Sequence, residues 1–163
     1  MQAYKQILVA LDLSEDSLFV CRRALDIARD YGANVLLIHV VEFVYQMSIA
    51  YDPLFYPAYD ELAINEEELI KRAREKMVGL IKELDMKDGS AGTRDKTSLD
   101  YEVVSGIPKT EILRIAEEKN ADLIVCGSHG RSGFELLLGS TANAILHHAA
   151  CDVLAVRSRK NTK

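Results

Sequence analysis

The fold is decided by residues 122–156, which read DLIVCGSHGRSGFELLLGSTANAILHHAACDVLAV. The apolar run Asp122–Cys126 has the composition of a short strand that is buried on both faces, and Asp152–Val156 repeats the pattern. Between these runs lie a glycine-rich segment and a helical stretch, Ser140–Ala149. A strand, a helix and a second strand in this order predict a parallel pair joined by a right-handed crossover.

The same alternation extends toward the N-terminus. Apolar runs predict further strands at Lys5–Leu11, Asn34–Val41 and Leu99–Val104. Helices are expected between these strands. The first is predicted to begin at the N-cap Ser14 and to end at Gly32, with its apolar face formed by Leu18, Cys21, Leu25 and Ala28. A long helix is predicted over 62–84, with Leu69, Ala73, Met77, Leu80 and Leu84 on one face, and a third is opened by Pro108, with Ile112, Ile115 and Ala116 buried.

This order predicts an α/β fold with three layers, in which helices cover both faces of an open, five-stranded parallel sheet of order 3-2-1-4-5. Ligands of such sheets bind beyond the carboxyl ends of the strands, where the strand order reverses. In this order the reversal lies between strands one and four. The loops expected there are Asp12–Ser14 and Gly127–Gly139.

We expect one domain over 1–163. Within it, 43–60 is a long loop rich in tyrosine and phenylalanine, 86–98 is a polar, flexible connector, and 157–163 is a polar tail. Loops of this length usually have a function or are disordered, and packing of the aromatic loop onto its own domain is the simplest expectation.

Composition excludes several classes of protein. The net charge is −5 and the basic residues are scattered, which argues against a nucleic-acid partner. No apolar run is long enough to span a membrane, and the N-terminus lacks the features of a signal peptide, so we expect a cytoplasmic protein. Its three cysteines, Cys21, Cys126 and Cys151, have neither zinc-site nor redox-motif spacing and are expected to be buried thiols.

The glycine-rich segment has the features of a phosphate site. Gly127, Gly130 and Gly139 allow the backbone to approach a ligand closely, and successive N–H groups in such a turn can form an anion-binding nest. Gly139 also opens a helix, whose first N–H groups favour an anion. Neither the GxxxxGK[ST] loop nor the GxGxxG fingerprint is present, and a turn that only joins a strand to a helix remains the alternative.

Residues 125–157, VCGSHGRSGFELLLGSTANAILHHAACDVLAVR, resemble the C-terminal signature of the universal stress protein family. The nucleotide-binding branch of that family has glycine, two residues, glycine, usually nine residues, and then Gly-Ser or Gly-Thr. The segments KQILVALDLSEDS, LLIHVVE and VVSGIPKTEIL resemble its other strands and turns, so the likeness covers nearly the whole chain. One departure is that eight residues, and not nine, separate Gly130 from Gly139.

The resemblance implies the adenine nucleotide alpha hydrolase-like fold, of flavodoxin/Rossmann-like architecture, and an adenine nucleotide as ligand. It assigns contacts with adenine, ribose or phosphates to twelve residues: Ala10, Leu11, Asp12, Val40, Gly127, Ser128, His129, Gly130, Arg131, Gly139, Ser140 and Thr141. Ala10, Leu11 and the backbone of Val40 would line the adenine pocket, and Gly139, Ser140 and Thr141 would hold the phosphate chain.

Some of these residues have a second interpretation. Asp12 is a candidate for holding Mg²⁺ through water, and equally for capping the helix or forming the turn. His129 can donate to a phosphate or face solvent, and Arg131 can neutralise phosphate charge or be solvated. Outside this set, His39 is expected to be a core histidine with its hydrogen bonds satisfied, while His147 and His148 suit a helix C-terminus.

The function expected is that of a stress-response regulatory module that binds ATP, ADP or AMP and whose nucleotide state alters its conformation or an unidentified protein partner. No nucleophile or general base is evident, so at most weak ATP hydrolysis is expected. The alternatives are a slow or partner-dependent ATPase with a metal near Asp12, a nucleotide-independent scaffold, and a flavin-binding protein. The resemblance also implies a homodimer formed through the last strand, Asp152–Val156.

Overall fold

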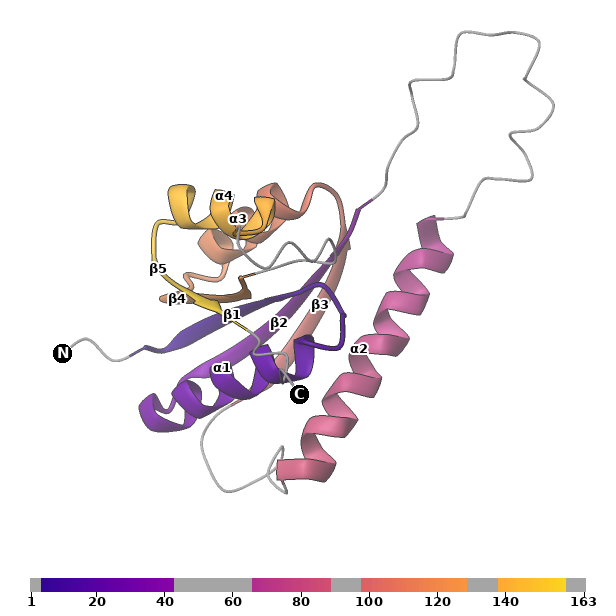
Figure 1. Cartoon of the computed structure of the whole chain (residues 1–163), viewed down its shortest axis with the longest axis horizontal. Coiled ribbons are helices and arrows are strands. Elements are labelled where there is room, and N and C mark those ends of the chain that lie inside the picture. The colour runs from indigo at the N-terminus through magenta and orange to yellow at the C-terminus, as the bar shows by residue number, and fades with distance from the viewer. Residues whose placement is uncertain (1–3, 43–65, 89–97, 129–137, 158–163) are drawn as a thin grey trace, which may run out of the picture.

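A five-stranded parallel sheet forms the centre of the molecule (Figure 1). The computed structural model describes residues 4–42, 66–88, 98–128 and 138–157. The sheet order is β3-β2-β1-β4-β5, as predicted. The strands are β1 (Gln6–Leu11), β2 (Asn34–Val41), β3 (Leu99–Ser105), β4 (Leu123–Gly127) and β5 (Asp152–Val156).

Among the described residues, helices α1 (Ser17–Tyr31) and α2 (Glu66–Asp88) cover one face of the sheet, and α3 (Pro108–Glu118) and α4 (Ser140–His148) cover the other (Figure 1). Ile7, Val9 and Leu11 of β1 lie in one core with α1 and α2, whereas Leu8 and Ala10 lie in a second core with α3 and α4. Since successive side chains of a strand point to opposite faces, a strand between two helical layers must be apolar at every position.

The start of α1 differs from the prediction. Ser14 is not its N-cap: Asp16 holds that position, no side chain caps the helix, and neither Glu15 nor Asp16 falls in its first turn. The predicted stop at Gly32 is confirmed, with φ at +67° and its N–H donating to the carbonyl of Ala28. Leu18 and Leu25 pack partly buried against the core that contains Cys21 and Ala28.

The other helices agree closely with the prediction. Ala73, Met77 and Leu84 of α2 are buried, and Leu69 and Leu80 pack against the same core. α2 continues past Leu84 to Asp88, into the segment expected to be a connector. Pro108 opens α3, where it needs no N–H partner, and Ile112, Ile115 and Ala116 are buried.

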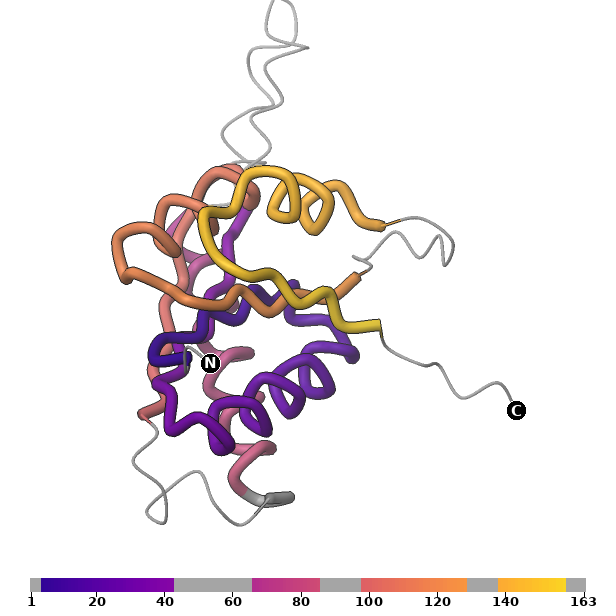
Figure 2. The backbone as a smooth tube through the Cα atoms, turned by 90° about the vertical axis from the view of Figure 1, so that its left-hand side faces the viewer, coloured from indigo at the N-terminus to yellow at the C-terminus, as the bar shows by residue number. Residues whose placement is uncertain are grey.

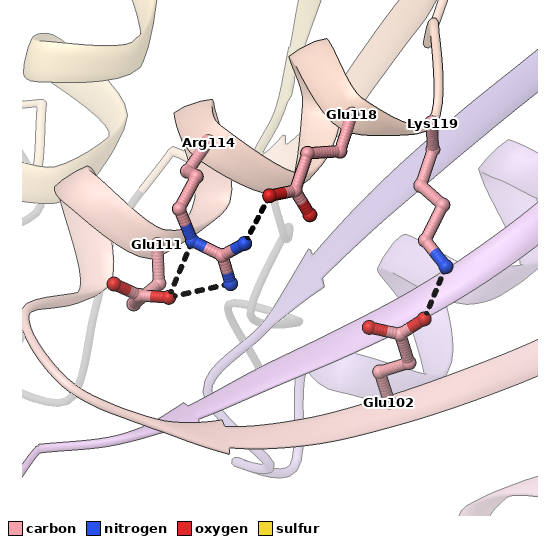
Figure 3. A network of polar contacts seen from close by, with 5 residues as sticks. All are labelled: Glu102, Glu111, Arg114, Glu118 and Lys119. Atoms are coloured by element: carbon pink, nitrogen blue, oxygen red, sulfur yellow. Dashed lines mark hydrogen bonds and ion pairs between the residues drawn. The ribbon is translucent and has the colours of Figure 1, made fainter.

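Ion pairs lie along α3, and one of them joins the end of this helix to the edge of the sheet (Figure 3). Arg114 binds Glu111 one turn before it, at 2.9 Å, and Glu118 one turn after it. Lys119 reaches across to Glu102 of β3 at 2.7 Å. These side chains are partly exposed to solvent, so each pair is expected to contribute little to stability.

The cysteines are free thiols. Cys21 and Cys126 are buried as expected, whereas Cys151 is only half-buried. Burial raises the pKa of Cys21 to about 12 and that of Cys126 to about 11. Both groups therefore stay protonated, and unreactive as nucleophiles, at neutral pH.

Several predictions lie outside the described residues: the aromatic loop 43–60, most of the connector 86–98, the tail beyond Arg157, and the middle of the glycine-rich segment. None of the helices in the described part of the chain is long and apolar enough to cross a membrane.

Candidate functional site

The end of β1 lies between the ends of β2 and β4. Ala10 pairs with Ile38 of β2 on one side and with Cys126 of β4 on the other. The strand order reverses at this point, because β2 and β3 lie on one side of β1 and β4 and β5 on the other. Asp12 leaves the sheet at the position where ligands of open parallel sheets bind.

A hydrogen bond joins the two ends of the glycine-rich segment. The N–H of Gly139 donates to the carbonyl oxygen of Ser128 at 2.9 Å, and the N–H of Ser128 donates to Val156 at 2.8 Å. Figure 2 shows the end of β4 and the start of α4 on the same side of the molecule. The first turn of α4 is thereby fixed beside the carboxyl end of β4.

The N-terminus of α4 has no side-chain cap. Gly139 is the N-cap, and its carbonyl accepts from the N–H of Asn143 at 2.8 Å. Ser140 is exposed and Thr141 is half-buried. The first backbone N–H groups of a helix have no partner within the helix, so this end is suited to an anion. Gly139 itself has φ of −59°, which any residue adopts, so conformation alone does not require glycine here.

Buried apolar residues lie next to the same strand ends. Ala10 and Val40 belong to the core shared with α3 and α4, together with Ala142 of α4. Ala10 is 9% exposed and Val40 is 7% exposed, so both lie at the margin of this core. Their backbone groups at the ends of β1 and β2 can line an apolar ligand, and the N-terminus of α4 can hold a negatively charged one.

Asp12 forms the turn between β1 and α1. Its Oδ1 atom accepts three hydrogen bonds, from the N–H of Ser14 at 3.0 Å, the hydroxyl of Ser14 at 2.6 Å and the hydroxyl of Ser17 at 3.1 Å. The first of these closes an Asx turn around Leu13, whose φ is +56°. The turn-forming interpretation of Asp12 is therefore observed, and the role in holding Mg²⁺ stays a prediction.

Ser17 was missed as a contributor to this site. It is 2% exposed, and its hydroxyl donates to Asp12 from the first residue of α1. The sequence signal for it is the spacing Asp12-x-Ser14-x-x-Ser17, which brings two hydroxyls to one carboxylate. His39, predicted to be a core histidine, is half-buried, and its Nδ1 lies 2.8 Å from the carbonyl oxygen of Leu11.

The structure places nine of the twelve predicted site residues; the other three, His129, Gly130 and Arg131, lie outside the described residues. The nine come from the ends of β1, β2 and β4 and the start of α4.

Apart from residues 43–65, 89–97, 129–137 and the two chain ends, the molecule has no cluster of three or more His, Cys, Asp or Glu side chains that could hold a metal ion.

A separate cavity of about 460 Å³ lies along α2. It is lined by side chains of both charges, and Lys71, Arg74 and Lys82 alternate there with Glu67 and Glu75. None of these residues belongs to the strand ends, so this depression is a solvated helix face and not part of the candidate site.

Comparison with known proteins identifies relatives over nearly the full length. Residues 3–157 match the sequence profile of the universal stress protein family. Universal stress protein A homolog 1 of Coxiella burnetii is 37% identical over 156 residues, covering 94% of this chain and 96% of that protein.

Solved structures share the fold. The universal stress protein UspA of Lactobacillus plantarum has a TM-score of 0.73 at 27% identity, covering 96% of this chain and 100% of that one. A universal stress protein crystallised in complex with cAMP has a TM-score of 0.66 at 23% identity, covering 97% and 100%.

Proposed function

Since this chain belongs to the universal stress protein family, we propose that it binds ATP or a related adenine nucleotide at the carboxyl ends of β1, β2 and β4. In this proposal the nucleotide acts as a regulatory ligand: its bound state alters the conformation of the protein or its contacts with a partner. A ligand shifts such an equilibrium only to the extent that it binds the two states with different affinity.

One observation carries the proposal: the hydrogen bond from the N–H of Gly139 to the carbonyl of Ser128. It fixes an uncapped helix N-terminus beside the end of β4. The nearby hydroxyl groups of Ser128, Ser140 and Thr141 add donors that suit phosphate oxygens. Within 129–137, His129, Gly130 and Arg131 are proposed to contact the ribose and phosphates.

The adenine ring is proposed to lie over Ala10 and Leu11, with polar contacts to the backbone of Val40. Ala10 and Val40 lie next to the strand ends in the core under α4, so a ring placed there would be close to the phosphate donors of the same helix. The protein crystallised with cAMP shows that this fold can hold an adenine nucleotide; for the present chain, support comes from its own residues.

Mg²⁺ is proposed to accompany a triphosphate and to contact Asp12 through water. Among the described residues, the three hydrogen bonds to the Asp12 carboxylate all reach Oδ1, so Oδ2 is the oxygen proposed for this contact. Mg²⁺ would neutralise phosphate charge at the site. We propose no efficient hydrolysis, since the site lacks an assigned nucleophile or base.

The protein is proposed to be a homodimer that pairs through β5. This strand is at the edge of the sheet, and Val153, Leu154 and Ala155 are only partly buried. An apolar edge strand with unpaired backbone groups favours pairing with a second copy. Light scattering at micromolar concentration tests this, and a monomer mass would contradict it.

The proposed function is tested by identifying the nucleotide that is released when gently purified protein is denatured, using mass spectrometry. The variants Gly130→Ala and Ser140→Ala are the controls, because both residues are proposed to lie on the phosphate side of the site. Stoichiometric ATP in the wild type and little in the variants supports the proposal, and ADP or AMP would identify another adenine nucleotide as the ligand. No nucleotide, and no binding of added Mg-ATP, would leave the nucleotide-independent scaffold as the function.

A further inference from the structure

A side chain of β2 is bonded to the backbone at the end of β1. The Nδ1 atom of His39 lies 2.8 Å from the carbonyl oxygen of Leu11. A carbonyl oxygen can only accept, so Nδ1 must carry the proton and donate it. The two residues are opposite each other in the parallel β1–β2 pair, where Leu11 is the last residue of β1. The bond therefore fixes the position from which the chain leaves the sheet.

The segment that follows needs such support. Leu13 has φ of +56°, a left-handed conformation that costs a non-glycine residue free energy. The carboxylate of Asp12 stabilises this turn from the α1 side, through Ser14 and Ser17. His39 holds the residue before the turn from the sheet, by its bond to the carbonyl of Leu11. The turn thus has one anchor in the helix and one in the sheet.

His39 lies on the other face of the sheet from Ala10 and Val40, two of the proposed adenine contacts. Its neighbours Leu37 and Val41, two residues away on the same strand, belong to the core with α1 and α2, whereas Ile38 and Val40 belong to the core with α3 and α4. His39 therefore acts through the backbone of β1 and does not itself reach a ligand that lies over Ala10 and Val40.

We propose that His39 is a positioning residue for the nucleotide site: its hydrogen bond to the carbonyl of Leu11 presets the Leu11–Ser14 backbone in the conformation that receives the nucleotide. This inference rests on the proposed function. A site that is preset loses less conformational freedom on binding, so its affinity is higher than that of the same residues in a loose turn.

The test compares a substitution of His39 that keeps a hydrogen-bond donor with substitutions that remove it. In His39→Asn, the amide nitrogen lies the same number of bonds from Cα as Nδ1 does, so it can donate to Leu11. His39→Leu has a similar size and no donor, and His39→Val is a second donor-free variant that suits a strand if the first fails to fold. The matched control is Asn34→Ala, which removes the hydrogen bonds from Ser98 at the opposite end of β2.

The dissociation constant for ATP is measured by calorimetry without Mg²⁺, alongside the melting temperature. We expect the donor-free variants to bind ATP about five- to tenfold more weakly than the wild type. His39→Asn should bind ATP within about twofold of the wild type. Asn34→Ala should have a lower melting temperature and an unchanged affinity for ATP. Equal affinities for wild type and the donor-free variants would overturn the positioning role and leave the proposed function standing. Absence of binding of ATP, ADP and AMP by the wild type, both with and without Mg²⁺, would overturn both.

Discussion

Gly139 and Ser128 are eleven positions apart in the sequence, and yet the N–H of Gly139 donates to the carbonyl oxygen of Ser128 at 2.9 Å. The backbone therefore returns to the end of β4 before α4 begins. Whatever the conformation between them, the first turn of α4 and the last residues of β4 remain neighbours. This explains how a chain with eight residues between Gly130 and Gly139 can keep the helix at the strand ends.

The uncapped start of α4 predicts opposite effects on stability and binding. Gly139 has φ of −59° and ψ of 150°, a backbone that suits a capping residue. We expect Gly139→Asp to raise the free energy of unfolding by about 0.5 kcal/mol, because its carboxylate caps the free N–H groups. The same carboxylate should repel phosphate, so ATP affinity should fall at least about tenfold.

The control for this variant is Gly139→Ser, which offers a cap without a charge. Chemical denaturation and calorimetry measure the two effects. If Gly139→Asp bound ATP as tightly as the wild type does, phosphate could not lie at the N-terminus of α4.

The three hydrogen bonds to Oδ1 of Asp12 predict different outcomes for two substitutions. Asp12→Ala leaves the buried hydroxyl of Ser17 without its acceptor, so we expect a loss of about 2–3 kcal/mol in the free energy of unfolding. Asp12→Asn keeps an oxygen acceptor and should lose less than about 1 kcal/mol. It removes the negative charge, however, and should abolish any Mg²⁺ dependence of ATP binding.

Both substitutions are compared by urea denaturation, and ATP titrations with and without Mg²⁺ are run on the Asn variant. If Asp12→Asn were as unstable as Asp12→Ala, the charge of the carboxylate and not its geometry would hold the turn.

Gly106, between β3 and α3, is expected to be intolerant of any side chain. Its φ is +147°, and an added Cβ would lie 2.8 Å from Cγ of Glu111. The Glu111 side chain is held by Arg114 (Figure 3), so a shift would disturb that ion pair. We expect Gly106→Ala to cost about 1–3 kcal/mol in the free energy of unfolding, measured by denaturation.

A matched control is Gly79→Ala in α2, where an added Cβ meets no atom within 4 Å. Alanine favours the helix over glycine, so this variant should gain about 0.5–1 kcal/mol. A Gly106→Ala variant as stable as the wild type would show that the turn relaxes freely.

Burial of the Cys21 thiol predicts that stability falls at high pH. The pKa of Cys21 is raised to about 12 in the folded protein, whereas an unfolded cysteine titrates near its ordinary value of about 8.5. Between these values the unfolded state releases a proton that the folded state keeps. The free energy of unfolding should therefore decrease by up to about 1.4 kcal/mol per pH unit from this group, and the contribution is fully present only below about pH 8.5.

The measurement is urea denaturation at several pH values between 8 and 11. Cys21→Ala, which also leaves a small cavity, should lower stability at neutral pH and flatten the slope above pH 9. A slope identical to that of the wild type would show that Cys21 ionises as readily in the folded state as in the unfolded one.

Much of the fold could be predicted because buried parallel strands have a simple signal. β1 and β2 lie between two helical layers, so their runs of Ile, Leu and Val cannot be mistaken for solvated strands. Gly32 and Pro108 ended and opened helices as predicted, since each is determined by local backbone conformation. The order of the strands followed from the alternation of elements and the handedness of crossovers.

The prediction was wrong where a side chain found a partner other than the expected one. Ser14 has the sequence of an N-cap, but the carboxylate of Asp12 takes both its N–H and its hydroxyl. The bond between His39 and Leu11 depends on the register of β1 against β2, which the sequence pattern does not specify. Residue types therefore predicted a candidate site on the loops after β1 and β4, while the contacts within those loops depended on tertiary structure.

The position of β1 at the centre of the sheet affects how the protein folds. β1, β2 and β3 can pair from neighbouring parts of the chain, but the contact of Ile7 with Leu123 closes a loop of more than a hundred residues. Such a closure is slow, because chain entropy is lost before the contact is gained. The proposed nucleotide site lies across the contact between β1 and β4, so it exists only after the two halves of the sheet have joined. A bound nucleotide would therefore stabilise the last-formed junction of the molecule, and its concentration in the cell would set how often that junction opens.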